Sequence, residues 1–594
     1  MVLLRSHSRY GLPLATPGRT IYVLVLLDDA VQGRRRAFQA PLSVIAADRP
    51  DQVPAALAAV TAALDQGRFV AGWLGYELGH VLEPRLAVSV RPGPLLRLGV
   101  FAGPSDAPPV PGGRTPGGRT PGGRTYVSPL RPEWDQAAYA ARFSQVKDLI
   151  AAGDIYQANL SFRAHFGFLG EARALYEQLL AVSGAAHCGF VDDGARQVLS
   201  LSPELFFDLA ADGAITVRPM KGTLARDGDD AAGRARLAAS PKDRAENLMI
   251  VDLIRNDLSR LAVGGSVAVS NLFQVETYPT LHTMVSTVAA TLRPGAGVTD
   301  ILRALFPCGS ITGAPKIRAM EILRDLETSP RGAYCGAVGY FAPDRSAHFN
   351  VAIRTITLSG GRGELGIGGG VVQDSVMESE YAECLLKARF FETARKPLEL
   401  IETLGWRDGR FTRLPLHMAR MEASARVLGL SYNSCDARLA LQAAVEGKKG
   451  KFRIRLTLDE AGALRATAHA LPDDPPHWTY AVSPLRTDSA DPLLRHKTTW
   501  REMYDAEAKR SGSDEVIFRN ARGELTEGAR SNIFVRRDGV LLTPPLDCGL
   551  LPGCLRAELL ETGQAREAVL TPADLQGEVW FGNSLRGLIL GTPI

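Results

Sequence analysis

The sequence predicts an α/β (α+β) protein built from two units. The chain of 594 residues is too long to fold around a single hydrophobic core. Alternating strand patterns and amphipathic helix patterns are interleaved along most of it. The pattern then changes near residue 396, and residues 396–594 have the size of an ordinary domain.

The overall composition excludes several classes of protein. Hydrophobic residues make up 45% and charged residues 22% of the chain, which is typical of a globular protein. The net charge of +4 gives no argument for a nucleic acid or a membrane surface as a partner. The seven cysteines form no C-x-x-C pair, so we expect neither a zinc site nor a disulfide framework, and we expect a reducing, cytoplasmic compartment. The apolar run 21–27 is too short to span a bilayer.

The first unit is expected to contain three parts. Residues 1–102 are strand-rich and are assigned to the same unit as the residues that follow the repeat. Residues 103–125 carry Pro-Gly-Gly-Arg-Thr three times in succession, a composition that builds neither a helix nor a central strand. We interpret this repeat as a solvated loop rather than a binding tail for an acidic partner. Residues 126–395 are expected to form the catalytic part of the unit.

The element patterns follow in chain order. In the first unit, helices are expected over 136–152, 242–260 and 375–393, and strands over 156–163, 197–209, 215–219, 332–341, 347–358 and 364–372. Beyond Pro397, we expect a strand over 398–404, a helix over 416–428 and strands around 453–457 and 526–535.

Lys221 is the first candidate for chemistry. It stands between the rigid Pro219 and the permissive Gly222, on a short platform that holds one amine. A desolvated amine can lose its proton and attack carbon, whereas a solvated lysine in a turn is the alternative. Glu204 precedes it across an expected hairpin. The pair can act as acid and nucleophile, or it can be an ordinary cross-strand ion pair.

Carboxylates on two expected helices suggest a cation site. Glu246 lies beside an apolar stripe, and Glu380, Glu383 and Lys387 share one helical face. We interpret Glu246 and Glu383 as converging on Mg²⁺, because two carboxylates with water suit a hard divalent cation. A simple i,i+4 pair of Glu383 with Lys387 is the alternative. The glycine run 366–370 can turn backbone N–H groups toward a carboxylate.

Six motifs of the first unit stand in a diagnostic order: Ser-Pro-Glu, Pro-x-Lys-Gly-Thr, Glu-Asn-x-Met-Ile-Val-Asp-Leu-x-Arg-Asn-Asp, the segment around His282, Thr-Gly-Ala-Pro-Lys and Gly-Ile-Gly-Gly-Gly-Val-Val. Their order closely resembles the chorismate-utilising enzymes, which include anthranilate synthase, isochorismate synthases and aminodeoxychorismate synthase component I. The resemblance covers about residues 130–395, and residues 72–77 show a weaker similarity to the same family. It implies a chorismate-binding, layered β-sandwich with flanking helices.

The resemblance also implies roles for matching residues. Glu204 corresponds to the general acid that helps the C4 hydroxyl leave, and Glu246 and Glu383 correspond to the Mg²⁺ ligands. The substrate contacts implied are a ring contact by His282, a pocket residue at Thr312, and further contacts by Tyr340, Arg354, Gly368, Gly369, Gly370 and Lys387.

Two positions choose among the reactions of this family. Gln157 stands where isochorismate and salicylate synthases carry a water-activating lysine, so water addition is disfavoured. Lys221 stands where anthranilate synthases have alanine, and a lysine there resembles aminodeoxychorismate synthase, in which it adds to C2 of the ring before ammonia attacks C4. No glutaminase-like Gly-x-Cys-x-Gly motif is present, so we expect ammonia from a separate glutamine amidotransferase subunit. No Leu-Leu-Glu-Ser motif typical of a tryptophan site is visible either.

The second unit carries residues that suit pyridoxal 5′-phosphate (PLP). These are Lys497, Glu527 and the anion cradle Gly553, Cys554 and Leu555 at an expected helix start. An exposed basic cluster is the alternative for Lys497. The region resembles the fold-type IV PLP enzymes, in a shortened form that keeps only Glu402 and Thr403 of their opening stretch. The resemblance implies that Lys497 bonds the cofactor, that Glu527 faces the pyridine nitrogen, and that Arg420, Gly553, Cys554, Leu555 and Ser584 hold the phosphate.

The joined resemblances imply a bifunctional enzyme of folate biosynthesis. The first unit would aminate chorismate to 4-amino-4-deoxychorismate, and the second would eliminate pyruvate to give 4-aminobenzoate, with Mg²⁺ and PLP as cofactors. The alternatives are an anthranilate synthase-like unit fused to a branched-chain or D-amino acid aminotransferase-like unit, and a scaffold that binds the amidotransferase without catalysis. A homodimer through the PLP unit is expected from the same resemblance.

Overall fold

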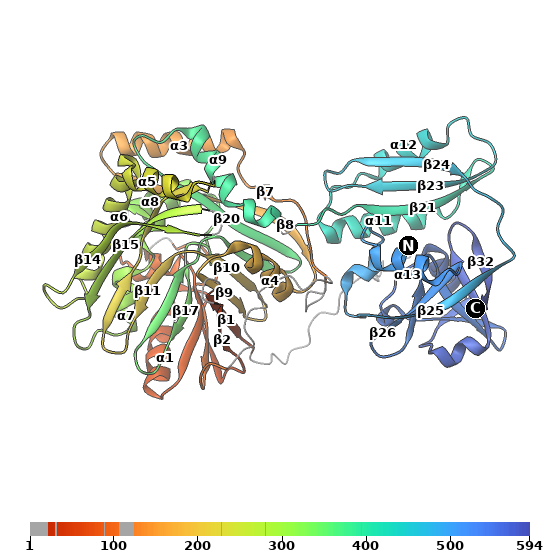
Figure 1. Ribbon diagram of the computed structural model, residues 1–594, viewed down its shortest axis with the longest axis horizontal. Coiled ribbons are helices and arrows are strands. Elements are labelled where there is room, and N and C mark those ends of the chain that lie inside the picture. The colour runs from red at the N-terminus through yellow and green to blue at the C-terminus, as the bar shows by residue number, and fades with distance from the viewer. Residues whose placement is uncertain are drawn as a thin grey trace, which may run out of the picture.

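The computed structural model describes residues 22–29, 33–87, 90–105, 124–226, 228–278, 281–393 and 395–594. Figure 1 shows two lobes lying side by side, and the chain passes from the first to the second after residue 393. Of the tandem repeat, Arg124 and Thr125 are described, and the expectation of a solvated loop falls mostly on residues outside the described ranges.

The first lobe is built on two mixed-order antiparallel sheets. The first sheet has the order β16-β8-β20-β19-β10-β9-β1-β2, with β6 and β7 beside β8. Its strands are β1 (Leu24–Asp29), β2 (Arg34–Phe38), β6 (Tyr126–Val127), β7 (Arg131–Pro132), β8 (Gln157–Leu169), β9 (His187–Asp192), β10 (Gln197–Ser202), β16 (Gly313–Ala314), β19 (Thr355–Ser359) and β20 (Arg362–Val371).

The second sheet has the order β13-β15-β12-β11-β18-β17-β4-β5-β3, with β14 beside β15. Its strands are β3 (Ser43–Ala47), β4 (Phe69–Leu74), β5 (Leu96–Phe101), β11 (Leu205–Leu209), β12 (Ala214–Val217), β13 (Met220–Ala225), β14 (Ala268–Thr277), β15 (Leu281–Thr291), β17 (Ala337–Phe341) and β18 (Ala347–Val351).

The two sheets pack face to face between layers of helices. Phe38 and Val198 of the first sheet meet Trp73 and Val338 of the second in a shared apolar core. The outer face of the first sheet is covered by α3 (Gln136–Ala151), α4 (Ala172–Ser183), α8 (Lys316–Leu326), α9 (Met377–Lys387) and α10 (Arg389–Thr393). The outer side of the second sheet meets α1 (Val53–Asp65), α2 (Leu78–Leu82), α5 (Asp230–Ala239), α6 (Pro241–Ser259) and α7 (Val298–Leu305). The predicted layered β-sandwich with flanking helices is confirmed.

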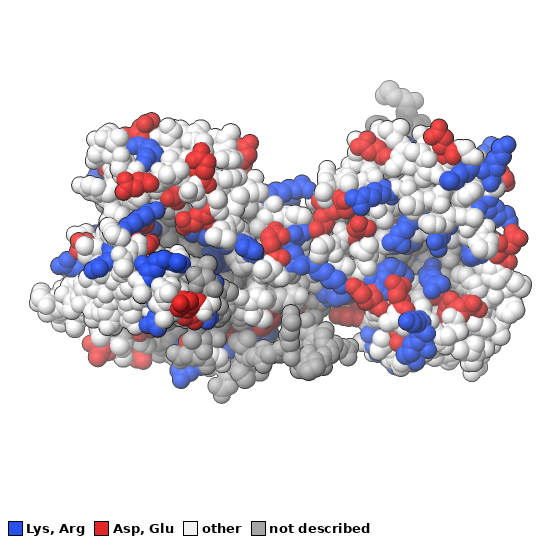
Figure 2. All heavy atoms as spheres, turned by 45° about the horizontal axis from the view of Figure 1, so that its top comes forward, with Lys and Arg blue, Asp and Glu red and all other residues white. Residues whose placement is uncertain are grey.

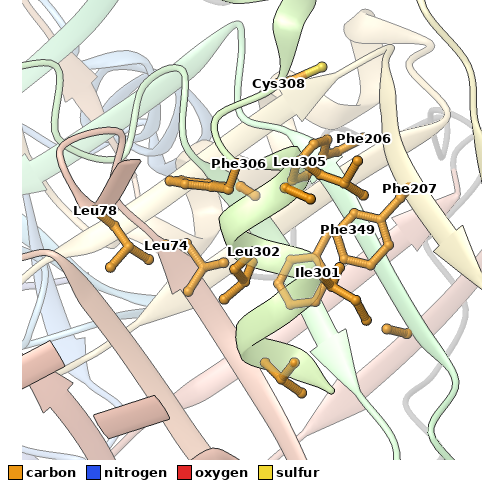
Figure 3. Close-up of a cluster of buried hydrophobic side chains, with 14 of the residues drawn as sticks. Leu74, Leu78, Phe206, Phe207, Ile301, Leu302, Leu305, Phe306, Cys308 and Phe349 are labelled. Atoms are coloured by element: carbon orange, nitrogen blue, oxygen red, sulfur yellow. The ribbon is translucent and has the colours of Figure 1, made fainter. Parts of the chain in front are cut away.

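The core under α7 shows why this helix forms where it does. Ile301, Leu302 and Leu305 recur on one face of the helix and are buried. Figure 3 shows them packed against Phe206, Phe207 and Phe349 of β11 and β18, with Leu74 and Leu78 nearby. Burying such side chains stabilises the fold by about 1.5–3 kcal/mol each.

Most expected elements of the first unit are present with shifted ends. The helices predicted over 136–152 and 242–260 are α3 and α6, and the strand predicted over 364–372 is β20. Five expectations were wrong in detail. The strand patterns predicted over 197–209 and 347–358 each divide into two strands of different sheets, β10 with β11 and β18 with β19. The strand predicted from residue 332 begins at Ala337, the helix predicted over 375–393 is divided into α9 and α10, and the strand-rich N-terminal part also contains the thirteen-residue helix α1.

The second lobe has two layers that face each other. A four-stranded sheet, β22-β21-β23-β24, packs against α11 (Leu414–Leu428) and α12 (Ser434–Val445). Its strands are β21 (Leu400–Arg407), β22 (Arg410–Phe411), β23 (Lys451–Leu458) and β24 (Leu464–Ala470). This layer forms although the stretch before Glu402 is short, because β21 pairs along its whole length with β23.

An eight-stranded sheet, β27-β26-β25-β32-β31-β28-β29-β30, forms the other layer, with α13 (Glu502–Ser511) and α14 (Cys554–Glu561). Its strands are β25 (His477–Thr487), β26 (Glu515–Asn520), β27 (Leu525–Gly528), β28 (Asn532–Arg537), β29 (Val540–Thr543), β30 (Ala565–Glu567), β31 (Glu578–Asn583) and β32 (Gly587–Pro593). The strand pattern around 526–535 is therefore two strands, β27 and β28. Among the residues described in both lobes, no helix is long and apolar enough to cross a membrane.

Candidate active sites

Lys221 lies at a β-bulge where β13 approaches α6. The pairing of β13 with β15 shifts register between Met220 and Thr223, which re-aims the side chain between them. Gly222 has φ +88°, and a Cβ there would lie 2.9 Å from Cβ of Asp243. Only glycine tolerates this backbone at such a close approach. The sequence interpretation of Gly222 as a residue that lets backbone come close agrees with this geometry.

The amine of Lys221 faces the glycine run of β20. A Cβ built on Gly370 would lie 2.9 Å from Lys221 Nζ and 3.1 Å from Gln157 Nε2, so these two side chains meet above the same glycine. The positive charge of Lys221 favours the ionised forms of Glu204, Glu246 and Glu383. It opposes the rise in pKa that burial causes in the first two and contributes to the lowered pKa of Glu383. The amine is therefore near enough to all three predicted carboxylates to act on their charge, without an ion pair to any of them among the described residues.

Glu204 has the properties of a general acid at neutral pH. Its side chain is buried, and this burial raises the pKa of the carboxyl to about 7, although a hydrogen bond from Ser310 Oγ at 2.7 Å and the charge of Lys221 oppose the rise. A carboxyl with a pKa near the working pH is protonated often enough to donate and basic enough to be reprotonated. Ser310 was not singled out in the sequence, because only the fold brings it to Glu204.

The two predicted metal ligands come from different helices. Burial raises the pKa of Glu246 on α6, and the charges of Lys221 and Lys242 oppose it. Glu383 on α9 pairs with Lys387 at 3.0 Å. Partial desolvation raises its pKa, but Lys387 and Lys221 outweigh that effect and hold it below its usual value. Glu380 adds a third, buried carboxylate, which accepts a hydrogen bond from Ser375 Oγ at 2.6 Å.

These carboxylates fit a hard divalent cation by their chemistry. Burial and the negative charge of Glu380 both disfavour the ionised form of Glu246. A bound cation would stabilise that ionised form. Oxygen donors of this kind are what Mg²⁺ prefers.

Arg354 lies near the thiol of Cys188 on β9, and no contact among the described residues places its guanidinium at Lys221 or at the glycine run. Burial lowers its pKa from the ordinary value. An unpaired, largely buried guanidinium is costly unless an anion joins it. The carboxylate contact expected of Arg354 stays a prediction. Lys387 Nζ donates to the carbonyl of Gly368 at 3.0 Å, so it borders the glycine run from the α9 side.

Three further predicted residues, Thr312, His282 and Tyr340, differ in where they lie relative to this site. Thr312 is buried and donates to the carbonyl of Gly309 at 3.1 Å, two residues from Ser310. His282 is buried under α5, where Nδ1 lies 2.9 Å from Thr277 Oγ1 and Nε2 lies 3.4 Å from Asp230. Tyr340 packs its ring on Phe38 in the core between the sheets, so the structure does not bring it to the amine. Ring contact by His282 and carboxylate contact by Tyr340 stay predictions.

Two residues at the site were given no direct role from the sequence. The amide of Gln157 is completely buried, and neither its oxygen nor its nitrogen has a hydrogen-bond partner among the described residues. The ring of Tyr334 lies directly over Gly366, at the start of the same glycine run. Tyr334 lies in the turn before β17 (Ala337–Phe341), whereas Tyr340 lies within that strand, so the two tyrosines point to different parts of the lobe although they are close in the sequence.

The predicted PLP residues of the second lobe, apart from Leu555, line one cavity of about 560 Å³. Burial lowers the pKa of Lys497 to about 8, with a further contribution from Arg420, and Nζ lies 3.4 Å from Thr403 Oγ1. Burial raises the pKa of Glu527 to about 7, against hydrogen bonds from Tyr504 at 2.8 Å and the Leu551 N–H at 3.0 Å. A lysine that loses its proton more easily than usual and a buried carboxyl are the two groups that the imine and pyridine nitrogens of PLP require.

The predicted phosphate residues form one connected network. Arg420 donates to Glu402 at 2.6 and 2.9 Å, and His417 joins Glu402 at 2.6 Å to Ser584 Oγ at 2.7 Å. Gly553 precedes α14, whose N-terminus has no side-chain cap, so the first N–H groups at Cys554 and Leu555 are open to an anion. This donor set fits a phosphate. The sequence gives His417 no role, because its link from Glu402 to Ser584 is visible only in the fold.

Comparisons with known proteins agree with this division of the chain. Residues 113–393 match the family model described as chorismate binding enzyme, and residues 399–592 match the model described as amino-transferase class IV. Aminodeoxychorismate synthase component 1 of Salmonella typhimurium is 48% identical over 250 residues, which are 41% of this chain and 54% of that protein. Anthranilate synthase component 1 of Methanothermobacter thermautotrophicus is 38% identical over 253 residues, 42% of this chain and 54% of that protein.

The chain thus spans about half the length of these curated relatives. Among solved structures, anthranilate synthase component I from Streptococcus pneumoniae is similar with a TM-score of 0.51 and 23% identity, over 65% of this chain and 94% of that chain. This likeness supports the fold of the first lobe.

Proposed function

Because the chain joins a chorismate binding enzyme domain to an amino-transferase class IV domain, we propose that it makes 4-aminobenzoate from chorismate in two steps. The observation that carries this proposal is the position of Lys221. Its amine lies beside Gly370 and Gln157 and faces Glu204, Glu246 and Glu383. A second reactive lysine, Lys497, lies buried in the other lobe.

The first step is amination of chorismate. Lys221 Nζ attacks C2 of the ring while the C4 hydroxyl leaves as water with a proton from Glu204. Ammonia then attacks C4, and the bond between C2 and Lys221 breaks. The ring has gained an amino group at C4, the lysine is free again, and Glu204 recovers a proton from the incoming ammonia.

The surrounding residues hold the substrate for this step. Arg354 and the backbone of the glycine run bind carboxylates, and Gln157 offers no base that could activate water instead of ammonia. Glu246 and Glu383 would hold Mg²⁺, which supplies positive charge for an anionic substrate. Burial of Glu204 keeps part of the carboxyl protonated at neutral pH, as the acid role requires.

The second step is elimination of pyruvate from 4-amino-4-deoxychorismate. The class IV domain implies PLP, which when bound supplies an electron sink for breaking bonds next to the amine. Lys497 would hold the cofactor, and its pKa of about 8 lets the amine exchange a proton near neutral pH. Glu527 would pair with the pyridine nitrogen. Arg420, Ser584 and residues 553–555 would hold the phosphate. Among class IV reactions we favour this one because it consumes the product of the first step.

The proposal includes partners beyond chorismate. A separate glutamine amidotransferase subunit supplies ammonia, and the second lobe forms a homodimer. The name component 1 of the relatives supports a companion subunit. The dispersed cysteines favour a cytoplasmic location.

Product analysis of the full chain tests the proposal. The purified protein is given chorismate, ammonium, Mg²⁺ and PLP, and the products are identified by mass spectrometry and chromatography. We expect 4-aminobenzoate and pyruvate in equal amounts, and accumulation of 4-amino-4-deoxychorismate by Lys497→Ala. Anthranilate as the product would establish the alternative enzyme, and binding of the amidotransferase without turnover would establish the scaffold.

A further inference from the structure

The junction between the lobes places a short segment of the first unit against the second. Thr125 Oγ1 donates to Gln178 on α4 at 3.0 Å, and Tyr126 pairs with Leu169 of β8, so the segment is fixed to the first lobe. The ring of Tyr126 lies edge-on to Trp500 at 5.9 Å and is buried in the core of the second lobe. Arg124, directly before these residues, therefore has a defined position at the second lobe.

Arg124 lines the cavity that contains Lys497 and Glu527. Its Nε donates to Asp491 at 2.7 Å, and Nη1 donates to the carbonyl of Trp500 at 3.5 Å. A guanidinium has five N–H donors, and the side chain is 37% exposed, so donors remain for a ligand.

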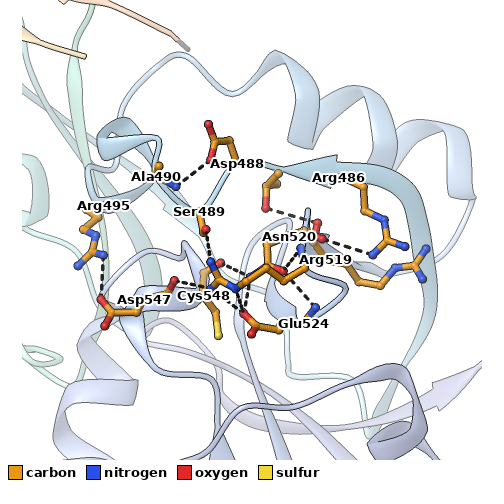
Figure 4. A network of polar contacts seen from close by, with 12 residues as sticks. Arg486, Asp488, Ser489, Ala490, Arg495, Arg519, Asn520, Glu524, Asp547 and Cys548 are labelled. Atoms are coloured by element: carbon orange, nitrogen blue, oxygen red, sulfur yellow. Dashed lines mark hydrogen bonds and ion pairs between the residues drawn. The ribbon is translucent and has the colours of Figure 1, made fainter. Parts of the chain in front are cut away.

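The residues that hold Arg124 are themselves well fixed. Asp491 accepts from the Leu493 N–H at 2.9 Å, and Asp488 accepts from the Ala490 N–H at 2.9 Å. Figure 4 shows Asp488, Ser489 and Ala490 beside the network around Asn520 and Cys548. The segment that carries Asp491 is thus anchored to the eight-stranded sheet, and it orients the guanidinium of Arg124.

The charge of the cavity exceeds what a phosphate group needs. Eight Lys and Arg side chains line it, against one Asp and one Glu. Figure 2 shows blue side chains gathered around the hollow of this lobe. Arg453, Arg455 and Arg530 have no side-chain hydrogen bond or ion pair among the described residues. A cavity with this surplus favours a ligand that brings several negative charges of its own.

We propose that Arg124 is a substrate-binding residue of the second site, contributed by the first unit. It binds one carboxylate of a cyclic dicarboxylate, while arginines of the second lobe bind the other carboxylate. The inference rests on the proposed function, because 4-amino-4-deoxychorismate has two carboxylates, whereas an ordinary amino acid substrate has one. The first unit then completes the specificity of the second site rather than only supplying its substrate.

The test uses the full chain with Arg124→Met. We expect KM for 4-amino-4-deoxychorismate in the second reaction to rise about 10- to 100-fold, as for loss of a charge-assisted hydrogen bond, with kcat changed less than about threefold. Amination of chorismate and the visible absorbance of bound PLP should stay as in the wild type. Arg124→Lys should recover part of the loss, because it restores charge without the fork of donors.

A matched control separates binding from damage to the junction. Arg395 lies at the same junction, where it contacts Glu460 and the carbonyl of Val127, but it does not line the cavity. Arg395→Ala should leave KM unchanged. An unchanged KM in Arg124→Met, or an equal rise in both variants, would overturn the inference.

A binding assay keeps the inference separate from the proposed function. Isophthalate, a dicarboxylate, and benzoate, a monocarboxylate, are titrated against the PLP-loaded chain, and the change of cofactor absorbance is followed. Wild type should prefer isophthalate, and Arg124→Met should lose that preference. If Arg124→Met loses the preference for isophthalate but the wild type does not turn over 4-amino-4-deoxychorismate, only the proposed reaction is refuted. If Arg124→Met keeps the preference, only the role of Arg124 is refuted.

Discussion

Replacing Ser310 by alanine should move the pH dependence of chorismate amination. Ser310 Oγ donates to Glu204 at 2.7 Å, a bond that favours the charged carboxylate and lowers its pKa against the effect of burial. A hydrogen bond to a charged group contributes about 1.5–3 kcal/mol. Since one pKa unit corresponds to about 1.4 kcal/mol, Ser310→Ala should raise the pKa of Glu204 by about 1–2 units from its value near 7.

The sign of the effect follows from the role of Glu204. A general acid must be protonated, so activity falls as pH rises through its pKa. In Ser310→Ala the alkaline limb of kcat/KM should therefore shift upward, to about pH 8–9. Chorismate consumption is measured across pH with total ammonium adjusted so that free ammonia is constant. Ser286→Ala is the control, because it removes a buried hydroxyl that donates to Asn247 and not to Glu204. It should leave the alkaline limb of kcat/KM unchanged. A limb that stays near pH 7 in Ser310→Ala would refute the acid role.

Three further variants test the remaining parts of the two sites. Lys221→Ala should lower chorismate amination by at least about a thousandfold while the absorbance of bound PLP is unchanged, and substantial residual 4-aminobenzoate would contradict a covalent role. Glu246→Gln should raise the Mg²⁺ concentration needed for half-maximal amination about tenfold or more, measured after chelator treatment; equal Mg²⁺ dependence would count against it as a ligand. Glu402→Gln should destabilise the second lobe by about 3–5 kcal/mol in denaturant unfolding, because it leaves Arg420 buried without its partner. The pKa of Glu402 is held at about 2, so the stability that its carboxylate gives the folded lobe is fully present above about pH 4.3. This stability should be lost as pH falls toward 2. Identical denaturant unfolding curves of this lobe at low pH and at neutral pH would contradict that account.

The candidate residues of both sites could be named from the sequence because they stand in short motifs, and their roles stay predictions. Lys221 and Gly222 are adjacent in the sequence, and the positive φ that favours glycine at position 222 is a local property. Residues 553–555 at the start of α14 are likewise contiguous. What could not be predicted is which motifs meet, because the contact of Lys221 with Gly370 depends on how two separate sheets pack.

Other features gave no local signal at all. Ser310 bonds Glu204 from a short turn more than a hundred residues later, and no periodicity marks such a contact. The strand predicted over 332–341 includes both Tyr334 and Tyr340, but Tyr334 lies in a turn before β17 and its ring lies over Gly366. The helix α1 was missed because its alanine-rich sequence has a weak apolar stripe within a strand-rich region.

The length of β8 bears on how one chain could keep the two proposed reactions apart. Its first residue, Gln157, lies at the amine of Lys221, and its last, Leu169, pairs with Tyr126 at the second lobe. Thirteen residues of strand span about 40 Å, so the intermediate must leave one site before it reaches the other. At the junction, a Cβ on Gly167 would lie 2.8 Å from the carbonyl of Leu428, so strand and α11 are in direct contact. The strand that begins at the first site therefore also fixes Tyr126, next to Arg124 in the wall of the second cavity, so the proposed role of Arg124 depends on the junction between the two lobes.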